Sequence, residues 1–441
     1  MGNEVNQQPV EFRERARFAL QHNDQALAET SYARVLESQP GDLEALKYLA
    51  QCQLLRGVGR RAVELMQTAV EAHPDDAPAW HQLGASYAMD GNLQAAADSL
   101  RQALQLAPGM YVARLRRGMT LEQLGDSHQA LIEYFTAVNI AQGQGQWLSD
   151  ETTAPDTRDA VRHAVRYIAT GRHALFNGVL EPLRQRYGRS ELVRVEQALA
   201  GYLGEQPVAW QDPRQRSKFF HFPGVPARTY YPREQLPWYE ALEDQTDVIR
   251  DELRAVLQET QNLEPFLGDK VKERPDMLAA FGPGRATWDA YFFHRHGKRY
   301  DEHCARCPHT TAALEVLPLD RVPNHSPETL FSVLRPGTHI LPHRGVTNTR
   351  VTSHLPLIVP PDCAIRVGGE IHTWQEGRCV TFDDTMEHEA WNKSDHTRVV
   401  LIFDCWNPDL TEIERLAVTD LVEAIGDFVD ACRRQTPESK A

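Results

Sequence analysis

A spacing of 34 residues recurs through the first third of the sequence and limits the possible folds more than any other feature. The residues that keep this interval are Pro40, Pro74 and Pro108; the small residues Ala16, Ala50, Gly84 and Gly118; and the alanines Ala28, Ala62, Ala96 and Ala130. Self-similarity at such a period indicates supersecondary units that stack on their neighbours. The sequence therefore predicts an α-solenoid in this region.

The pattern resembles the tetratricopeptide repeat, in which each unit is a helix–turn–helix. The small residues allow the two helices of a unit to cross closely, and the proline ends the second helix. Four units are expected over residues 9–142. Repeats of this kind present a concave surface to a protein or peptide partner, and the alternative is a scaffold without one.

The sequence after the repeats changes character twice before the last third. Residues 143–157 are polar and rich in Gly, Ser, Thr and Pro, which predicts a linker. Helical periodicity returns over 158–203, a helical extension or cap of the solenoid, and again over 238–257. A Pro- and Arg-rich connection lies between the last two segments.

Short β-rich runs separated by turn residues follow residue 281. The predicted strands are 312–317, 329–334, 350–359, 364–367, 378–382 and 397–403. Many short strands at this spacing favour a jelly roll or a similar double-sheet barrel, which can hold a ligand between its sheets. The fold class expected is thus an α-solenoid followed by a β-domain.

Composition excludes some classes of partner. The net charge of −14 provides no basic field for nucleic acid. No apolar run reaches the length of a membrane span, and Met1–Ala19 has no apolar core of a signal peptide. We therefore expect a cytoplasmic protein.

The cysteines do not form a disulfide framework, because their number is odd and their spacing irregular. Cys304 and Cys307 are the close pair. A zinc site would need two further ligands, for which His303 and His309 are the nearby candidates. Ordinary reduced thiols are the favoured interpretation, and a redox-sensitive pair is another.

Two histidines and an arginine stand beside apolar strands in the last quarter of the sequence. His343 and His388 each lie at a strand edge, and Arg398 begins an apolar run. Imidazole suits Fe(II), whose open coordination positions accept O2 and a chelating acid. A guanidinium is a natural partner for a second carboxylate of that acid. The three residues together predict an iron site with a dicarboxylate cosubstrate.

This part of the sequence resembles the aspartyl/asparaginyl β-hydroxylase family. The motifs that carry the resemblance are Ser332–His339, Pro342-His343, Thr347–Arg350, His354–Leu357, Phe382–Asp384, His388-Glu389 with Trp391, Arg398 and Trp406–Pro408, preceded by Phe222–Gly224 and Leu236–Trp238. The resemblance covers about residues 220–411, and 412–441 are expected to form a C-terminal helix and tail. Members with N-terminal tetratricopeptide repeats are a familiar arrangement.

The resemblance implies a double-stranded β-helix that uses Fe(II), 2-oxoglutarate and O2. It assigns His343 and His388 as iron ligands, and Arg398 and Ser332 to the far carboxylate of 2-oxoglutarate. His354 matches a histidine near the chelating carboxylate. The family often has an arginine two residues before that histidine; this sequence has Thr352 there, and Arg350 two residues further back. Arg350 is therefore the candidate for that contact with the cosubstrate.

The usual third iron ligand, a carboxylate two residues after the first histidine, is absent because that position is Gly345. Water in its place is what the resemblance implies. Alternatively Asp384 reaches the iron, although a role in orienting water or a histidine is the more plausible one. A halide is the third possibility, and the remaining hydroxylase motifs disfavour it.

Two functions compete. The first is a hydroxylase acting on an Asp- or Asn-type side chain, in a protein or as a small molecule, with the repeats binding the substrate or a partner; related members act on other small molecules and lipids. The second is a tetratricopeptide adaptor whose barrel has lost activity. The complete set of His343, His388 and Arg398 favours the enzyme.

Overall fold

The computed structural model describes residues 4–259, 263–268, 277–281 and 285–435. Contacts divide the chain into two compact units, Met1–Ala174 with Asp427–Ala441, and Leu175–Gly426. Across the described ranges, no helix combines the length and the apolar character needed to cross a bilayer. The domain boundaries expected from the sequence stay predictions.

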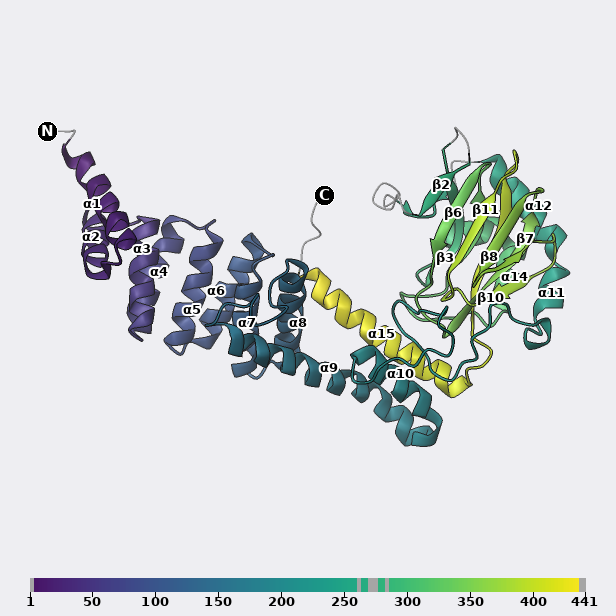
Figure 1. Cartoon of the computed structure of the whole chain (residues 1–441), viewed down its shortest axis with the longest axis horizontal. Coiled ribbons are helices and arrows are strands. Elements are labelled where there is room, and N and C mark those ends of the chain that lie inside the picture. The colour runs from purple at the N-terminus through teal and green to yellow at the C-terminus, as the bar shows by residue number, and fades with distance from the viewer. Residues whose placement is uncertain (1–3, 260–262, 269–276, 282–284, 436–441) are drawn as a thin grey trace. The chain divides into compact units, whose positions relative to one another are not determined.

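The first unit is built from four antiparallel helix pairs (Figure 1). The helices are α1 (Glu4–Gln21), α2 (Gln25–Ser38), α3 (Leu43–Leu55), α4 (Gly59–Ala72), α5 (Ala77–Met89), α6 (Leu93–Leu106), α7 (Tyr111–Gln123) and α8 (Ser127–Gly143). Each pair is one helix–turn–helix of the repeat, so the predicted helical repeats are confirmed.

The repeated small residues lie where the two helices of a pair cross. Ala16 and Ala50 are fully buried. A Cβ atom added to Gly84 would lie 2.6 Å from Cγ of Leu100, and one added to Gly118 would lie 2.7 Å from Cδ1 of Tyr134. Any larger side chain would push the helices apart, which explains why the sequence keeps this position small.

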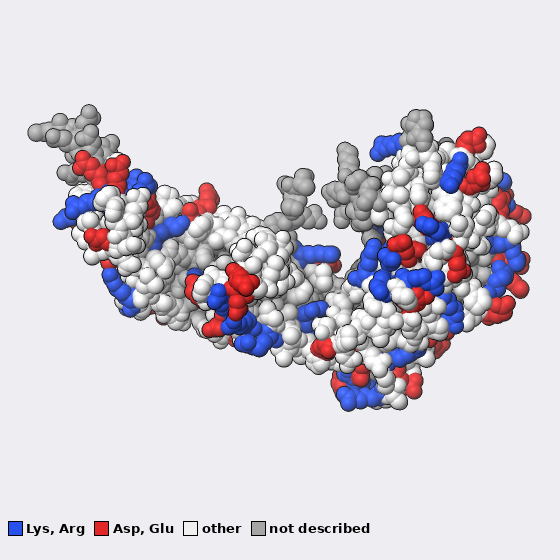
Figure 2. Space-filling view, in the orientation of Figure 1, with Lys and Arg blue, Asp and Glu red and all other residues white. Residues whose placement is uncertain are grey.

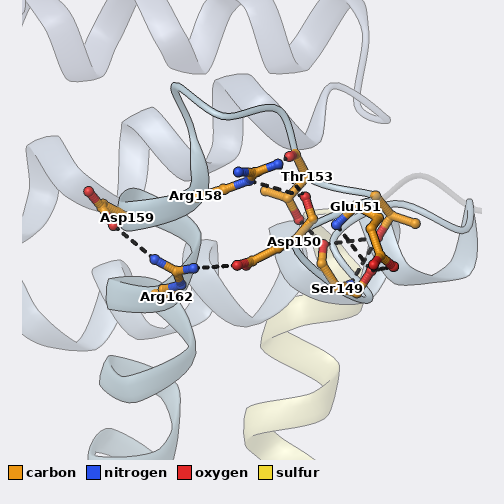
Figure 3. Close-up of polar contacts among 8 residues, drawn as sticks. Ser149, Asp150, Glu151, Thr153, Arg158, Asp159 and Arg162 are labelled. Atoms are coloured by element: carbon orange, nitrogen blue, oxygen red, sulfur yellow. Dashed lines mark hydrogen bonds and ion pairs between the residues drawn. The ribbon is translucent and has the colours of Figure 1, made fainter.

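The predicted linker over 143–157 is the connection between α8, which ends at Gly143, and α9, which begins at Arg158, and its turns are held by hydrogen bonds (Figure 3). Arg158 Nη2 donates to the carbonyl of Asp150 at 2.7 Å, and Arg162 Nη2 contacts Asp150 Oδ2 at 2.6 Å. The buried ring of Trp147 meets Tyr111 edge-on at 4.9 Å. Polar composition alone did not reveal these anchors.

Three further helical segments follow, α9 (Arg158–Tyr187), η1 (Arg189–Leu192) and α10 (Val193–Leu203). The C-terminal helix α15 spans Glu412–Arg434, and its last turns belong to the first unit. There, Phe428 meets Phe135 edge-on at 5.1 Å, and Arg114 donates to the backbone carbonyl of Gln435.

The second unit contains two antiparallel sheets. The strands are β1 (Glu264–Pro265), β2 (Leu278–Ala280), β3 (Trp288–Arg295), β4 (Lys298–Arg299), β5 (Thr329–Leu334), β6 (Thr338–His343), β7 (Arg350–Ile358), β8 (Cys363–Val367), β9 (Glu370–His372), β10 (Val380–Phe382), β11 (His388–Asn392) and β12 (Arg398–Trp406). The first sheet has the order β1-β3-β5-β12-β7-β10, with β4 on β3, and the second has the order β2-β6-β11-β8-β9.

The two sheets face each other across a shared core. Leu334 and Val400 from the first sheet join Ile340 and Ile365 from the second in one buried cluster. From β5 to β12 the chain alternates between the sheets, with β8 and β9 both in the second. The predicted β-domain is therefore confirmed as a domain of two antiparallel sheets, and both sheets line the space between them.

Helices cover the outer face of the first sheet (Figure 1). They are η2 (Arg233–Gln235), α11 (Tyr239–Glu243), α12 (Thr246–Gln258), α13 (Asp301–Arg306) and α14 (Pro308–Glu315). Leu253 and Leu314 pack in the cluster that contains Leu401 of β12.

One predicted strand is wrong, because most of 312–317 lies in α14. Pro308 occupies the first turn of that helix, where its missing N–H is harmless. The carboxylate of Glu252 accepts hydrogen bonds from the backbone N–H groups of His309 and Thr310 at 2.8 Å. A short apolar run alone does not distinguish a buried strand from such a helix.

Candidate active site

The two predicted histidines lie opposite each other on neighbouring strands. His343 ends β6, His388 begins β11, and the two are Cα partners in the antiparallel pairing. Their ring centroids are 4.0 Å apart. In each ring Nδ1 contacts a backbone carbonyl, that of Leu341 at 2.8 Å and that of Met386 at 3.0 Å. A carbonyl can only accept, so Nδ1 carries the proton and Nε2 keeps the lone pair of a metal ligand.

The protonation state also suits a metal ligand. Burial, together with the charge of His343, lowers the pKa of His388 to about 3. The imidazole of His388 is therefore neutral at pH 7, the state in which imidazole binds a metal.

Asp384 occupies the space that a side chain at position 345 would need. A Cβ atom added to Gly345 would fall on the carboxyl group of Asp384, and the Gly345 N–H donates to the Asp384 carbonyl at 2.7 Å. Burial raises the pKa of Asp384 to about 7, and its Oδ1 is buried without a hydrogen-bond partner in the described structure. A carboxyl group is thus present beside Gly345, supplied by another segment.

These donors fit an iron ion of the kind that the sequence predicted, although the described residues contain no cluster of three or more His, Cys, Asp or Glu side chains that could hold a metal. Two facing imidazoles leave several coordination positions open. The unpartnered oxygen of Asp384 can accept a hydrogen bond from a ligand or water in such a position.

Arg398 is a buried guanidinium to which no described carboxylate is paired. Arg398 is the first residue of β12, and only 2% of it is exposed. Its Nη1 lies 3.4 Å from Oγ of Ser332. The guanidinium lies 4.9 Å from the ring centre of Trp374, and its Nε has no partner. Burial lowers the pKa of Arg398 to about 10, so the group stays charged at neutral pH and calls for an anion.

Ser332 and His354, the other predicted cosubstrate contacts, line the same cavity. Ser332 Oγ accepts a hydrogen bond of 2.9 Å from Nε1 of Trp288. His354 is buried, its Nδ1 has no partner in the described part of the chain, and burial holds its pKa well below 6.5.

Arg350 lies in this cavity too, but carboxylates hold it. Its Nη1 is 3.1 Å from Asp404 Oδ2 and 3.9 Å from Asp320 Oδ2. Thr352, which stands at the position where the family often has arginine, donates to Asp404 Oδ1 at 3.2 Å. The expected contact of Arg350 with the cosubstrate stays a prediction.

The site is a cavity of about 320 Å³ between the two sheets. It contains every predicted site residue: Ser332, His343, Arg350, His354, Asp384, His388 and Arg398. Sequence reasoning missed Glu328 and Asp404, which also line it. Asp404 could have been found, because Arg398, Ile402 and Asp404 alternate along one strand and share its inner face.

Cys304 and Cys307 lie outside this cavity as buried free thiols. Burial raises the pKa of Cys307 to about 12, so its thiol is protonated at neutral pH.

Comparison with known proteins finds family models that match both parts of the chain. The family model described as aspartyl/asparaginyl beta-hydroxylase matches residues 243–408, and tetratricopeptide-repeat models match residues 19–87 and 77–110.

Three relatives illustrate the range of similar proteins. The human aspartyl/asparaginyl beta-hydroxylase is 25% identical over 88% of this chain and 52% of its own length. The rat aspartate beta-hydroxylase domain-containing protein 2 is 32% identical over 56% of this chain and 70% of its own length. The ornithine lipid ester-linked acyl 2-hydroxylase of Rhizobium tropici is 35% identical over 40% of this chain and 60% of its own length. This chain spans about half the length of the human protein.

Proposed function

Because the chain belongs to the aspartyl/asparaginyl β-hydroxylase family, we propose that it is an Fe(II)- and 2-oxoglutarate-dependent dioxygenase that hydroxylates an amino-acid side chain. The observation that carries the proposal is the guanidinium of Arg398, which pairs with no carboxylate of the described residues, in the cavity that also holds the facing rings of His343 and His388. A buried cation without an anion indicates a place for a carboxylate cosubstrate.

The strand order supports this proposal. Eight strands, β5 to β12, form two four-stranded layers, β5-β12-β7-β10 and β6-β11-β8-β9. We interpret this arrangement as a jelly roll of the double-stranded β-helix type.

Each residue has a defined task in the proposed reaction. His343 and His388 would hold Fe(II), and the iron with its cosubstrate would supply the oxidising chemistry. Arg398 and Ser332 bind the far carboxylate of 2-oxoglutarate. His354, which is neutral and whose Nδ1 has no partner among the described residues, would hydrogen-bond the chelating end. Asp384 orients water beside Gly345.

Apolar side chains line part of the cavity around the two histidines. Phe382 meets the ring of His354 edge-on at 5.1 Å, and Ile340, Ile365 and Ala390 line the cavity from the second sheet. These apolar side chains surround the two histidines, and a less polar surrounding would strengthen charge interactions inside the cavity.

The substrate proposed from the family is an Asp- or Asn-type side chain, in a protein, in a peptide or free. The name of the Rhizobium relative describes a lipid acyl hydroxylase, so a lipid is the second candidate. The repeats favour a macromolecular substrate or a partner that delivers one.

The repeats offer a groove for such a partner. A hollow of about 650 Å³ is lined by α3, α5, α6 and α7. Lys47, His81 and Arg116 contribute donor groups to it, and Leu55 and Met89 expose apolar surface. We propose a protein or peptide partner here. On the face drawn in Figure 2 acidic and basic side chains are interspersed, and the net charge is −14, which supports the expectation that nucleic acid is not a partner.

Succinate formation from 2-oxoglutarate with Fe(II) and O2 tests the proposal. The His343→Ala and His388→Ala variants should lose it, whereas His396→Ala, with a side chain 76% exposed, should keep it. No succinate from the parent protein, together with no binding of iron or 2-oxoglutarate, would favour the alternative of an inactive tetratricopeptide adaptor.

A further inference from the structure

The two arginines of the cavity are in opposite electrostatic situations. Arg398 has no carboxylate partner in the described structure, whereas Arg350 is held between Asp404 at 3.1 Å and Asp320 at 3.9 Å. A guanidinium that is already neutralised by carboxylates has little attraction left for another anion. The cavity therefore has one place for an acidic ligand, and the proposed cosubstrate fills it.

These arginines mark two ends of the cavity. Arg398 and Asp404 share the inner face of β12 and lie roughly 20 Å apart along the strand. Thr352, which is the Cα partner of Asp404, belongs to the Asp404 end, and Ser332 belongs to the Arg398 end. A cosubstrate bound at Arg398 thus leaves the Asp404 end for the substrate.

The Asp404 end carries more acidic than basic groups. Glu328, Asp384 and Asp404 line it, and Arg350 is the basic group among the described lining residues there. Oε1 of Glu328 lies 2.8 Å from Nδ1 of His296, a residue that does not line the cavity. A substrate carboxylate entering this end would meet the carboxylates of Glu328 and Asp404, and like charges placed side by side repel.

We infer that the substrate group entering the Asp404 end carries N–H donors, as an amide or a cation does, and is not a carboxylate. This inference rests on the proposed function and narrows it, because it favours an asparagine-type or basic side chain over aspartate. Thr352 keeps this end of the cavity acidic, because it is uncharged and donates a hydrogen bond to Asp404. An arginine at position 352 would instead add positive charge there.

A peptide mixture from a digested proteome provides the probe. The full-length protein is incubated with the mixture, Fe(II), 2-oxoglutarate and O2, and mass spectrometry locates each added oxygen atom while succinate is measured separately. We expect oxygen on Asn, Gln, Lys or Arg residues, at least about tenfold more often than on Asp or Glu. Oxygen mainly on Asp or Glu overturns the inference.

Two variants make the test independent of one substitution. Asp404→Asn releases Arg350 and should shift the added oxygen towards Asp and Glu by about tenfold, whereas Asp251→Asn, a side chain 70% exposed on α12, should not. Glu328→Gln should shift it the same way if Asp404→Asn does not fold. An unchanged pattern of oxidised residues in a folded variant contradicts the inference.

The succinate measurement separates the inference from the proposed function. Succinate without any modified peptide counts against the inference and leaves the proposed function standing. If no succinate forms, the proposed function itself is contradicted.

Discussion

Arg398 and Arg350 show how the partners of a residue decide its chemistry. Both are arginines on inner strands of one sheet, and both line one cavity. Arg398 contacts Ser332 and Trp374 and pairs with no carboxylate in the part of the chain that the structure describes, whereas Asp404 and Asp320 hold Arg350. The sequence predicted a cosubstrate role for both arginines, because a sequence shows the residue types but not which carboxylates pair with each arginine in the fold.

Replacing Arg398 with alanine should weaken the use of 2-oxoglutarate. A charge-assisted hydrogen bond contributes about 1.5–3 kcal/mol, so the KM for 2-oxoglutarate should rise about 10- to 100-fold. Succinate formation as a function of 2-oxoglutarate concentration measures the change. Arg254→Ala, an exposed arginine paired with Asp251 on α12, is the matched control. Equal KM values for 2-oxoglutarate in both variants would show that Arg398 does not bind 2-oxoglutarate.

His354 should make the fold sensitive to acid. Its pKa is far below 6.5 in the folded protein because of burial, so the unfolded chain binds a proton more readily. Its contribution to stability is present above pH 6.5 and is lost as the pH falls towards the folded pKa. The free energy of unfolding should therefore fall less steeply between about pH 7 and pH 5 in His354→Asn than in the parent protein. Denaturant titrations at both pH values measure this, and equal slopes would contradict it.

At the scale of elements, the sequence predicted well wherever one face of an element must be buried. The 34-residue interval placed the helix pairs because Gly84 and Gly118 have no room for a side chain. Strand β5 was predicted over its full length, as all its residues are buried. Strands β6 and β11 were missed, although they carry His343 and His388, because their mixed burial gives no clear apolar run.

Gly118→Ala tests the close crossing of α7 and α8. The added methyl group would lie 2.7 Å from the buried ring of Tyr134, which cannot move without disturbing its neighbours. Overpacking of this kind costs about 1–3 kcal/mol, measurable by chemical denaturation. Gly109→Ala, at a position with no heavy atom within 4 Å, should have little effect. If the Gly118→Ala variant is as stable as the Gly109→Ala variant, the crossing of α7 and α8 has room for the added methyl group.

At the scale of the molecule, the order along the chain differs from the grouping in space. The sequence predicted a C-terminal helix and tail after 411, and composition gave no sign of which unit they join. The described residues 427–435 group with the repeats, which lie far earlier in the sequence. Such a contact depends on particular side chains, here Phe428 on Phe135 and Arg114 on Gln435, and periodicity within a segment does not reveal it.

Phe428→Ala should therefore destabilise the repeats. Phe428 is 3% exposed, and a buried phenylalanine-to-alanine change costs about 3–5 kcal/mol. Hydrogen exchange should show faster exchange in α7 and α8, while the strands of the second unit keep their protection. Ile371→Ala, at a side chain 64% exposed, is the control. Unchanged exchange in α7 and α8 would contradict the coupling.

The crowding of Gly345 by Asp384 has an evolutionary consequence. The two positions share one volume, so an acidic side chain at 345 and the present Asp384 exclude each other. A Gly345→Asp substitution alone should abolish activity rather than create a site with two histidines and a carboxylate, whereas adding Asp384→Gly should relieve the clash. Any mutational route between the two forms of the site passes through a poorly fit single mutant, so the pair should be inherited together.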